Sequence, residues 1–499
     1  MAPYTFGSRW GGVARTLLLA GAAAALAAAC TTGRTPRTPD VGLPAAFEAG
    51  ASSPLQTAAL DRWWTLYGDP ELERLVEQAL AASPSARLAE ARLEEARAIR
   101  QGALARFAPQ GALEGSSGYR YTEDLNDGGG GISIPGLPPG IGFNQAGTST
   151  SSALNFNVSW ELDLFGRRAA ARRSAEADLA AARFVFEGAR AQLAADTAGA
   201  LFNARGLAIQ LDDAEETLRI ANELLRVVRR RVDVGLSAPS DAARVETEQA
   251  AAEAEVRRLE AELRAARRQL LVLVGRGVEP TDALPVAAVV TDPPAPPATL
   301  PGELLARRPD VREAQARLES AAGGLRTAEL EFFPRLNLLP GVGLSLSEQE
   351  GFEQRNAFWS LAAGLAVPVL DRPRLRAQLR AQTARAEQAV IGYEQAVQNA
   401  FSEAERTLVL LNADRARTAA LARGEERARV AYNAAQRRYG AGLDNLQTVL
   451  DAERSWRGAR SALSGARVQA LQRSVQVFQA LGGGWSPSLV QTASTGTGR

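Results

Sequence analysis

The stretch ALNFNVSWELDLF, residues 153–165, decides how the rest of the chain is interpreted. Apolar and polar side chains alternate along it without interruption. The apolar set is Leu154, Phe156, Val158, Trp160, Leu162 and Leu164, and the polar set is Asn155, Asn157, Ser159, Glu161 and Asp163. Because successive side chains of a β-strand point to opposite faces, this alternation predicts a strand over about 152–165 with one apolar and one polar face.

Three further segments predict strands of the same kind. Alternation begins after Pro109, over about 111–122, and the later part of the chain alternates over about 335–347 and 357–370. The Gly- and Pro-rich run NDGGGGISIPGLPPGIG, residues 126–142, predicts an exposed loop between the first two strands. Strands of this length reach across a bilayer when tilted, since about 9 to 11 residues are enough.

Four strands do not close a membrane barrel. An open edge in lipid leaves unpaired backbone groups that cost several kcal/mol each, and such barrels begin at about eight strands. Two copies of the chain give a barrel too narrow for a pore, whereas three copies give twelve strands and leave a channel. A soluble sheet with one buried face gives the same alternation and stays open as the alternative at this stage.

The two halves of the chain resemble each other. Residues 83–113 and 308–338 superpose without a gap, and Pro84 matches Pro309 as Pro109 matches Pro334, at an offset of 225 residues. Further along, Gly235 matches Gly442 and Glu246 matches Glu453, at an offset of 207 residues. Matched prolines and glycines indicate a tandem duplication, in which each half reads helix, strand, strand, very long helix, break, helix.

Each half contains a long segment without proline, between Pro139 and Pro239 and between Pro373 and Pro487. A helix over 167–232 would be about 100 Å long at 1.5 Å per residue. Its apolar residues step mostly by three and four, which predicts a coiled-coil seam. The seam consists of Leu201, Ala204, Ala208, Leu211, Ala214, Leu218, Ala221, Leu225, Val228 and Val232.

Both long helices are interrupted by similar stretches, RRRVDVGLSAPS at 229–240 and QRRYGAGLDNLQ at 436–447. Each has a glycine followed by leucine within a charged helical run. Reversal between two helices usually requires a residue that adopts positive φ, so Gly235 and Gly442 predict turns.

Composition excludes several classes of function. With 57 Lys and Arg against 56 Asp and Glu, the net charge of +1 argues against a nucleic-acid binder. The chain has no histidine, the commonest general base and metal ligand, and a single cysteine, so neither a disulfide nor a thiolate metal cluster is expected. No constellation of catalytic residues is recognisable, and we expect neither an enzyme nor a bound metal or cofactor.

The N-terminus has the form of a secretory signal. Arg9 and Arg15 precede the apolar run TLLLAGAAAALAAA, which ends at Cys30. This resembles a bacterial lipoprotein signal, which implies lipidation of Cys30, although Ala27 stands where leucine is usual; a plain cleaved signal is the alternative. Thr31, rather than aspartate, resembles the outer-membrane sorting case. No other stretch is long and apolar enough for a transmembrane helix.

An ordered set of motifs resembles the TolC-like outer-membrane efflux proteins (outer membrane factors), and within them the lipoprotein branch that includes NodT and OprM. The motifs are WWTLYGDPELERLVEQAL (63–80), WELDLFGRR (160–168), RRPDVREAQARLESA (307–321), FFPRL (332–336), VPVLDRPRLRAQ (367–378) and YGAGLDNLQTVLDAERSW (439–456). The resemblance implies a mainly α homotrimer with a twelve-stranded membrane β-barrel and a periplasmic tunnel of coiled-coil helices. It also implies a passive exit duct for small molecules such as drugs, working with a periplasmic adaptor and an inner-membrane pump of the RND type.

The same resemblance assigns the functional residues. The adaptor-binding tips would be Arg231, Val234, Gly235, Leu236 and Ser237 with Arg438, Tyr439, Gly442, Leu443 and Asp444. Asp451 would form a carboxylate ring with its symmetry mates, and Arg454 would pair with it to hold the gate closed. The constriction one turn earlier falls on Gln447 beside Leu446, which argues against a purely hydrophobic plug. A turn glycine without a partner and an exposed helical ion pair are the simpler alternatives.

The expected organisation is a signal peptide at 1–29, a lipid-anchored extended segment at 30–62, efflux repeats at 63–290 and 291–485, and a disordered tail at 486–499. Two other functions stay compatible with the sequence. One is a non-transporting coiled-coil scaffold lipoprotein tethered to the envelope. The other is the outer-membrane component of a type I protein secretion system.

Overall fold

The computed structural model describes residues 39, 41–49, 57–123, 147–349 and 352–486. Cys30, the signal peptide, most of the 30–62 segment and the tail beyond Ser486 lie outside the described residues.

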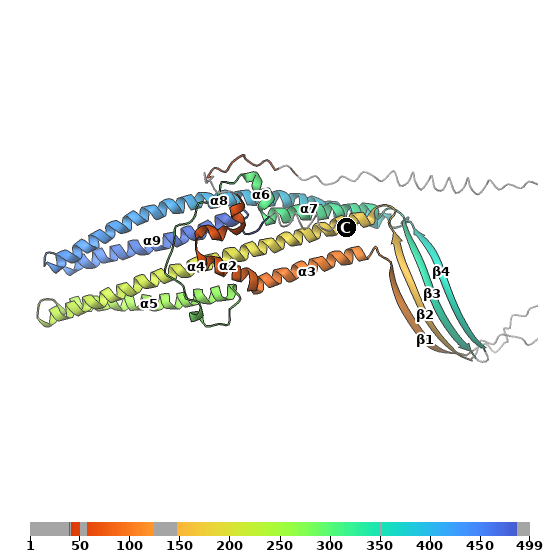
Figure 1. The fold of residues 1–499 in the computed structure, drawn as a ribbon, viewed down its shortest axis with the longest axis horizontal. Coiled ribbons are helices and arrows are strands. Elements are labelled where there is room, and N and C mark those ends of the chain that lie inside the picture. The colour runs from red at the N-terminus through yellow and green to blue at the C-terminus, as the bar shows by residue number, and fades with distance from the viewer. Residues whose placement is uncertain (1–38, 40, 50–56, 124–146, 350–351, 487–499) are drawn as a thin grey trace, which may run out of the picture. The chain divides into compact units, whose positions relative to one another are not determined.

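Figure 1 shows the elements of each half. The first half contains η1 (Thr57–Tyr67), α2 (Pro70–Ala82), α3 (Pro84–Ala105), β1 (Gln110–Thr122), β2 (Gly147–Leu162), α4 (Arg167–Asp233), α5 (Pro239–Leu273) and η2 (Thr281–Ala283). The second contains α6 (Pro301–Arg307), α7 (Pro309–Leu330), β3 (Arg335–Gln349), β4 (Phe352–Ala366), α8 (Arg372–Gly440) and α9 (Leu446–Ala480).

The element order confirms the predicted duplication, because α3-β1-β2-α4-α5 is repeated as α7-β3-β4-α8-α9. The chain divides into two compact units. One unit contains the sheet, within residues 98–177 and 319–388. The other unit contains residues 38–97, 178–318 and 389–499, with both helical hairpins.

The four strands form one antiparallel sheet in the order β1-β2-β3-β4. Phe156 lies opposite Leu113 on β1 and opposite Val342 on β3, so the two halves join through the pairing of β2 with β3. Directly opposed residues share a face, and the predicted apolar and polar faces are therefore continuous across all four strands. The apolar face includes Leu113, Leu154, Phe156, Trp160, Leu338, Val342, Leu344, Trp359, Leu361 and Leu365.

The strand limits differ from the predicted ones for identifiable reasons. β2 ends at Leu162 rather than 165 because the Asp163 carboxylate accepts hydrogen bonds from the backbone amides of Gly166 and Arg167 at 2.8 and 2.7 Å, which starts α4. β4 ends at Ala366 rather than 370, before Pro368, because proline donates no ladder hydrogen bond. β2 and β4 also begin earlier than predicted, at Gly147 and Phe352, because β1 and β3 extend the ladders to those residues.

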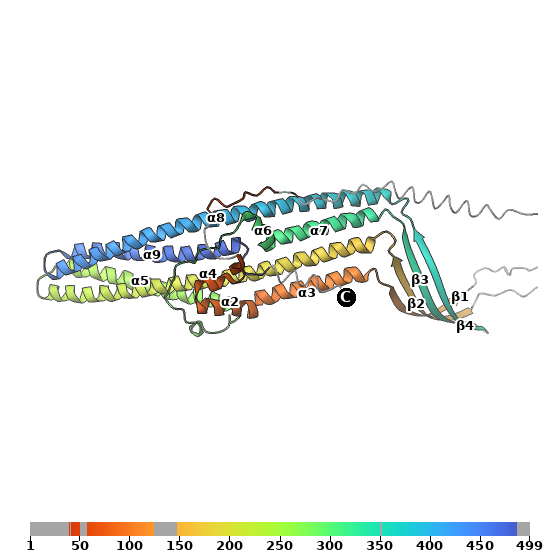
Figure 2. The same cartoon turned by 45° about the horizontal axis from the view of Figure 1, so that its top comes forward.

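The two long helices confirm the predicted proline-free runs. α4 has 67 residues and α8 has 69. Most residues of the predicted seam on α4 are buried, among them Leu201, Ala204, Leu225 and Val228. Figures 1 and 2 show that α5 returns along α4 and that α9 returns along α8, so each half supplies one helical hairpin. Within the described residues, no helix combines the length and the hydropathy that crossing a bilayer requires.

The helical unit has its main apolar core around the motif that begins at Trp63. The Trp63 indole is fully buried and stacks on Phe478 of α9, with ring centroids 5.6 Å apart and an interplanar angle of 9°. Tyr67 packs against Phe202 of α4 and makes a buried hydrogen bond with Ser474. Burial of these rings fixes η1 against α4 and α9.

Glycines with positive φ close both returning helices in the same way. Gly275 after α5 has φ 78° and Gly482 after α9 has φ 76°, again 207 residues apart. A Cβ on Gly275 would lie 2.6 Å from the carbonyl oxygen of Ala82, and a Cβ on Gly482 would lie 2.8 Å from that of Arg307. Glycine is therefore required both for its φ and for the close backbone approach.

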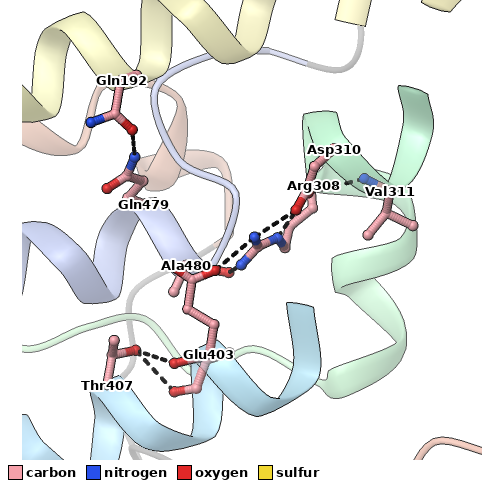
Figure 3. A network of polar contacts seen from close by, with 9 residues as sticks. Gln192, Arg308, Asp310, Val311, Glu403, Thr407, Gln479 and Ala480 are labelled. Carbon is pink, nitrogen blue, oxygen red and sulfur yellow. Dashed lines mark hydrogen bonds and ion pairs between the residues drawn. The ribbon is translucent and has the colours of Figure 1, made fainter. Parts of the chain in front are cut away.

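Arg308, the second arginine of the RRPD motif, joins three helices of the helical unit (Figure 3). Its guanidinium donates to both carboxylate oxygens of Asp310 at 2.9 and 2.7 Å, to Glu403 of α8 at 2.8 Å and to the carbonyl of Ala480, the last residue of α9, at 3.1 Å. Only 11% of the side chain is exposed. Arg308 thus satisfies a carbonyl at a helix end while neutralising two carboxylates.

Replacement of Arg308 by alanine is expected to lower the free energy of unfolding by about 2–3 kcal/mol, because charge-assisted hydrogen bonds are lost at a buried position. Thermal melting of the detergent-solubilised protein, followed by circular dichroism, measures the change. Arg317→Ala is the matched control, since that side chain is 64% exposed and, among the described residues, pairs with Glu313 on its own helix. Equal melting temperatures for the two variants would contradict a structural role for Arg308.

Candidate gate and docking tips

The two hairpin turns have the same backbone geometry. Gly235 has φ 77° and Gly442 has φ 79°. In the first turn the amide of Leu236 donates to the carbonyl of Arg231 at 2.7 Å, and in the second the amide of Leu443 donates to that of Arg438 at 2.9 Å. With the accompanying bonds from each glycine amide, both turns are Schellman motifs, which confirms the predicted positive φ and its structural reason.

The side chains of the turns differ in spite of the shared backbone. Val234, Leu236 and Leu443 are between 64% and 69% exposed, so each tip presents apolar surface. Arg438 donates to both oxygens of Asp444 at 2.7 and 3.0 Å across the second turn. Ser237, the residue that matches Asp444 by the offset of 207, carries no charge, so only the second tip has this ion pair.

Arg231 and Tyr439, two of the predicted tip residues, connect the hairpins to each other. The Arg231 guanidinium donates to the Tyr439 hydroxyl at 3.2 Å and lies 5.5 Å from the centre of the Tyr439 ring. One residue lies on α4 and the other on α8. A cation over an aromatic face with an added hydrogen bond makes this a directional link between the two hairpins.

A chain of polar contacts joins α5 to α9 behind the tips. Arg244 donates to Gln447 at 2.6 Å, Gln447 donates to Asp451 at 2.8 Å, and Arg454 approaches Asp451 at 3.6 Å. Arg454 also donates to Glu248 of α5, which lies 3.7 Å from Arg457. We call the residues Arg244, Glu248, Gln447, Asp451, Arg454 and Arg457 the interhairpin network. The network pairs charged side chains of α5 with those of α9, two helices that belong to different hairpins.

The structure brings the predicted gate residues together and adds partners that sequence reasoning missed. Asp451 and Arg454 are in contact as their spacing indicates, but the hydrogen-bond partner of Arg454 is Glu248, about 200 residues earlier in the chain. The one sequence signal for a partner on α5 was the duplication, because the offset of 207 residues relates Asp451 on α9 to Arg244 on α5, the helix that carries Glu248. The Leu446 side chain lies outside the described residues.

A cavity of about 250 Å³ lies between α4, α5 and α9, next to the network. Its lining includes Asp213, Glu216, Ile220, Glu248, Leu259, Trp456 and Arg460. The Trp456 indole stacks on Tyr432 with centroids 5.1 Å apart and donates to Glu425 at 2.9 Å. The two rings pack between α8 and α9. Trp456 also lines the cavity, where α9 is incompletely packed against α4 and α5.

Two carboxyl groups near this cavity are at least partly buried, which disfavours their ionised form. Burial raises the pKa of Asp213, and Arg460, which contacts it, only partly opposes the effect. Burial likewise raises the pKa of Glu453 on α9, against the attraction of Arg457 at 3.7 Å. Both groups favour the protonated form in the folded protein more than in the unfolded chain.

Comparison with known proteins identifies the family to which this arrangement belongs. Residues 75–276 and 300–483 match the family described as outer membrane efflux protein. This chain is a member of the outer membrane efflux protein family. It is therefore an efflux channel of the outer membrane, and its sheet and hairpins are those of a TolC-like channel.

The similarity to known proteins extends along almost the whole chain. The pyoverdine export outer membrane protein OpmQ of Pseudomonas putida is 31% identical over 92% of this chain and 95% of its own length. The toluene efflux pump outer membrane protein TtgF of Pseudomonas putida is 29% identical over 88% of this chain and 89% of its own length. Among solved structures, the outer-membrane channel OprN has a TM-score of 0.75 and 30% identity, over 91% of this chain and 100% of that one.

The raised pKa values of this efflux protein predict a pH dependence of its stability. Because the folded state holds these protons more tightly, the contribution of Asp213 and Glu453 to stability increases as the pH falls through their folded pKa values and is lost as the pH rises above them. We expect Asp213→Asn and Glu453→Gln to melt at a higher temperature than the unmodified protein at neutral pH, with a difference that shrinks as the pH is lowered from neutral into the acid range and both carboxyl groups become protonated. Thermal melts across this pH range measure it. Glu426→Gln, at an exposed position on α8, is the control, and a pH-independent difference would contradict the assignment.

Proposed function

We propose that this efflux protein acts as a homotrimer and forms the exit duct of a tripartite pump. The observation that supports it best is the two-faced sheet. Its apolar face is exposed, with Trp359 at 79%, Leu365 at 67% and Leu113 at 66%. In the described chain β1 and β4 pair on one side only. An apolar outer surface with unpaired edges suits strands that continue into those of neighbouring copies within lipid.

Three copies supply twelve strands, enough to enclose a polar channel. The polar face of the sheet then lines the lumen and the apolar face contacts lipid, which is the alternation of a membrane barrel. The hairpins of the three copies supply twelve helical segments for a periplasmic tunnel, which the sequence resemblance also implies.

The interhairpin network is proposed as the lock of the closed duct. Arg454 bonds to Glu248 across the two hairpins, and Arg231 bonds to Tyr439 nearer the tips. Both contacts must break if α8 and α9 move away from α4 and α5. Asp451, Gln447 and Leu446 are the residues proposed to narrow the bore, with the Asp451 carboxylates of three copies acting as a cation-attracting ring.

The tips are proposed as the docking site of a periplasmic adaptor. Exposed Val234, Leu236 and Leu443 surround rigid glycine turns, and exposed apolar side chains on a defined backbone are typical of a contact surface for another protein. The tip set also includes Arg231, Gly235, Ser237, Arg438, Tyr439, Gly442 and Asp444. An inner-membrane pump of the RND type would act through that adaptor.

Small organic molecules are the proposed cargo. The similar proteins carry names that refer to pyoverdine export and toluene efflux. A duct that serves an adaptor and a pump takes cargo already selected by them, so the lumen needs only to let such molecules pass.

Planar bilayer recording of the purified trimer tests both the duct and its lock. The unmodified protein is expected to conduct, and Glu248→Ala and Arg454→Ala are each expected to raise the single-channel conductance. Surface ion pairs contribute about 0.2–1 kcal/mol each. Arg454→Ala removes one interhairpin pair in each of three subunits and shifts the equilibrium toward opening by up to about 3 kcal/mol, whereas Glu248→Ala removes two, the pairs with Arg454 and Arg457. Arg429→Ala removes an ion pair confined to α8 and is the control. Absence of any conductance would overturn the duct, whereas conductance unaltered by both variants would overturn only the lock.

Lipidation of Cys30 is the remaining part of the proposal. We expect the mature protein to begin at Cys30 and to carry covalent acyl chains, two or more of which hold a protein stably at a membrane. Intact mass measurement of the purified protein gives the added mass directly, and Cys30→Ala should abolish it. A mature chain that begins at another residue with no added mass would support a plain cleaved signal.

A further inference from the structure

An aromatic side chain in the middle of β4 lies on the polar face of the sheet. The register that pairs Trp359 with Val342 on the apolar face puts Phe358 opposite Gly343 on the other face. Its neighbours on β4 on that face are Asn356 and Ser360. By the register, Phe352 at the start of β4 also falls on this face, whereas Phe358 lies in the middle of the strand and is 47% exposed.

The Phe358 ring leans over the backbone of Gly343. A Cβ built on Gly343 would lie 2.5 Å from Cζ and 2.6 Å from Cε1 of the ring, and it would also overlap Oδ1 of Asn155 on β2. Asn155 therefore approaches Gly343 from one side and Phe358 from the other, in one row across β2, β3 and β4. The absence of a side chain at Gly343 allows the ring to lie low on the sheet.

The next row provides the contrast. Gly341 is flanked by Oδ1 of Asn157 and Oγ of Ser360, each 3.0 Å from the position of its Cβ. Both rows therefore have a glycine at the centre with side chains leaning over it, but the Gly341 row carries only polar groups. An aromatic ring packed over a glycine stabilises a pair of strands. This structural role explains why one face of the Phe358 ring contacts β3. It does not account for the half of the ring that stays exposed among amides and hydroxyls.

We propose that Phe358 is the contact point in the lumen for planar aromatic solutes that pass through the duct. The proposal rests on the proposed function, because the trimeric duct turns the polar face toward the lumen and brings three copies of the ring to one level. An exposed ring in a polar wall offers π-stacking to aromatic solutes and cation–π contact to cationic ones. Contacts at a single level are weak enough to release the solute, as conduction requires.

The geometry predicts opposite effects for the two partners of the Phe358–Gly343 pair. Phe358→Ala removes the ring and should widen the lumen. Gly343→Ala introduces a Cβ where the ring now lies, and should push the ring away from the sheet and narrow the lumen. Phe358→Leu keeps an apolar side chain across the strand pair but removes the π-face.

Planar bilayer recording with ethidium, a planar aromatic cation, tests the proposal on the intact trimer. Current block by ethidium should weaken about three- to tenfold in both Phe358→Ala and Phe358→Leu, the range for loss of one stacking or cation–π contact. Conductance in salt alone should rise in Phe358→Ala and fall in Gly343→Ala. Ser345→Ala, on the same face of β3, is the control variant, and tetraethylammonium, a cation without a ring, is the control probe.

Equal ethidium block in the unmodified protein and in both Phe358 variants, from trimers that conduct normally, would overturn the proposal and leave the duct intact. Absence of conductance from the unmodified trimer would overturn the proposed function itself. Because Phe358→Leu preserves the apolar cross-strand contact, loss of block in that variant with an unchanged salt conductance separates solute recognition from a structural role of the ring.

Discussion

The unpaired edges of the four-stranded sheet are the constraint on which the rest of this protein depends. β1 and β4 each offer a row of backbone donors and acceptors, and the apolar face between them exposes Trp359, Leu361 and Leu365. In lipid an unpaired backbone group costs several kcal/mol, and in water an apolar face of this size promotes association. Only pairing with further strands relieves both costs, so the single chain is best understood as one third of the proposed assembly.

Duplication explains why the two helical hairpins share a backbone but differ in chemistry. Their turns have φ values within a few degrees of each other at Gly235 and Gly442, because helix reversal constrains both equally. Helix reversal does not constrain the side chains on the turns or those on the adjoining parts of α5 and α9, and these differ between the two copies. The second copy provides Asp451 and Arg454, the first provides Glu248 and Arg244, and the contacts between the hairpins depend on this divergence.

The helical unit combines a tightly fixed part with a loosely packed one. The Trp63–Phe478 stack fixes η1 against α9, and the Arg308 hydrogen bonds fix the start of α7 to the end of α9 and to α8. Toward the tips, apolar contacts are confined to small clusters such as Leu225, Val228 and Val245, and they are accompanied by ion pairs, a cavity and two carboxyl groups with raised pKa values. Ion pairs near the surface contribute little to the free energy of unfolding and break readily, which suits the proposed lock of the duct.

By itself, the sequence determined the elements that arise from local rules. Alternation predicted the strands and their two faces, the absence of proline predicted α4 and α8, and a glycine in a helical run predicted each turn, because periodicity and the sign of φ are properties of neighbouring residues. Asp451 and Arg454 were also predictable as a pair, since three residues separate them on one helix. The tertiary structure decided which distant residues meet. The pairing of β2 with β3, the bond from Arg454 to Glu248 and the position of the Phe358 ring over Gly343 depend on register and packing between segments far apart in the chain, and no local pattern specifies them.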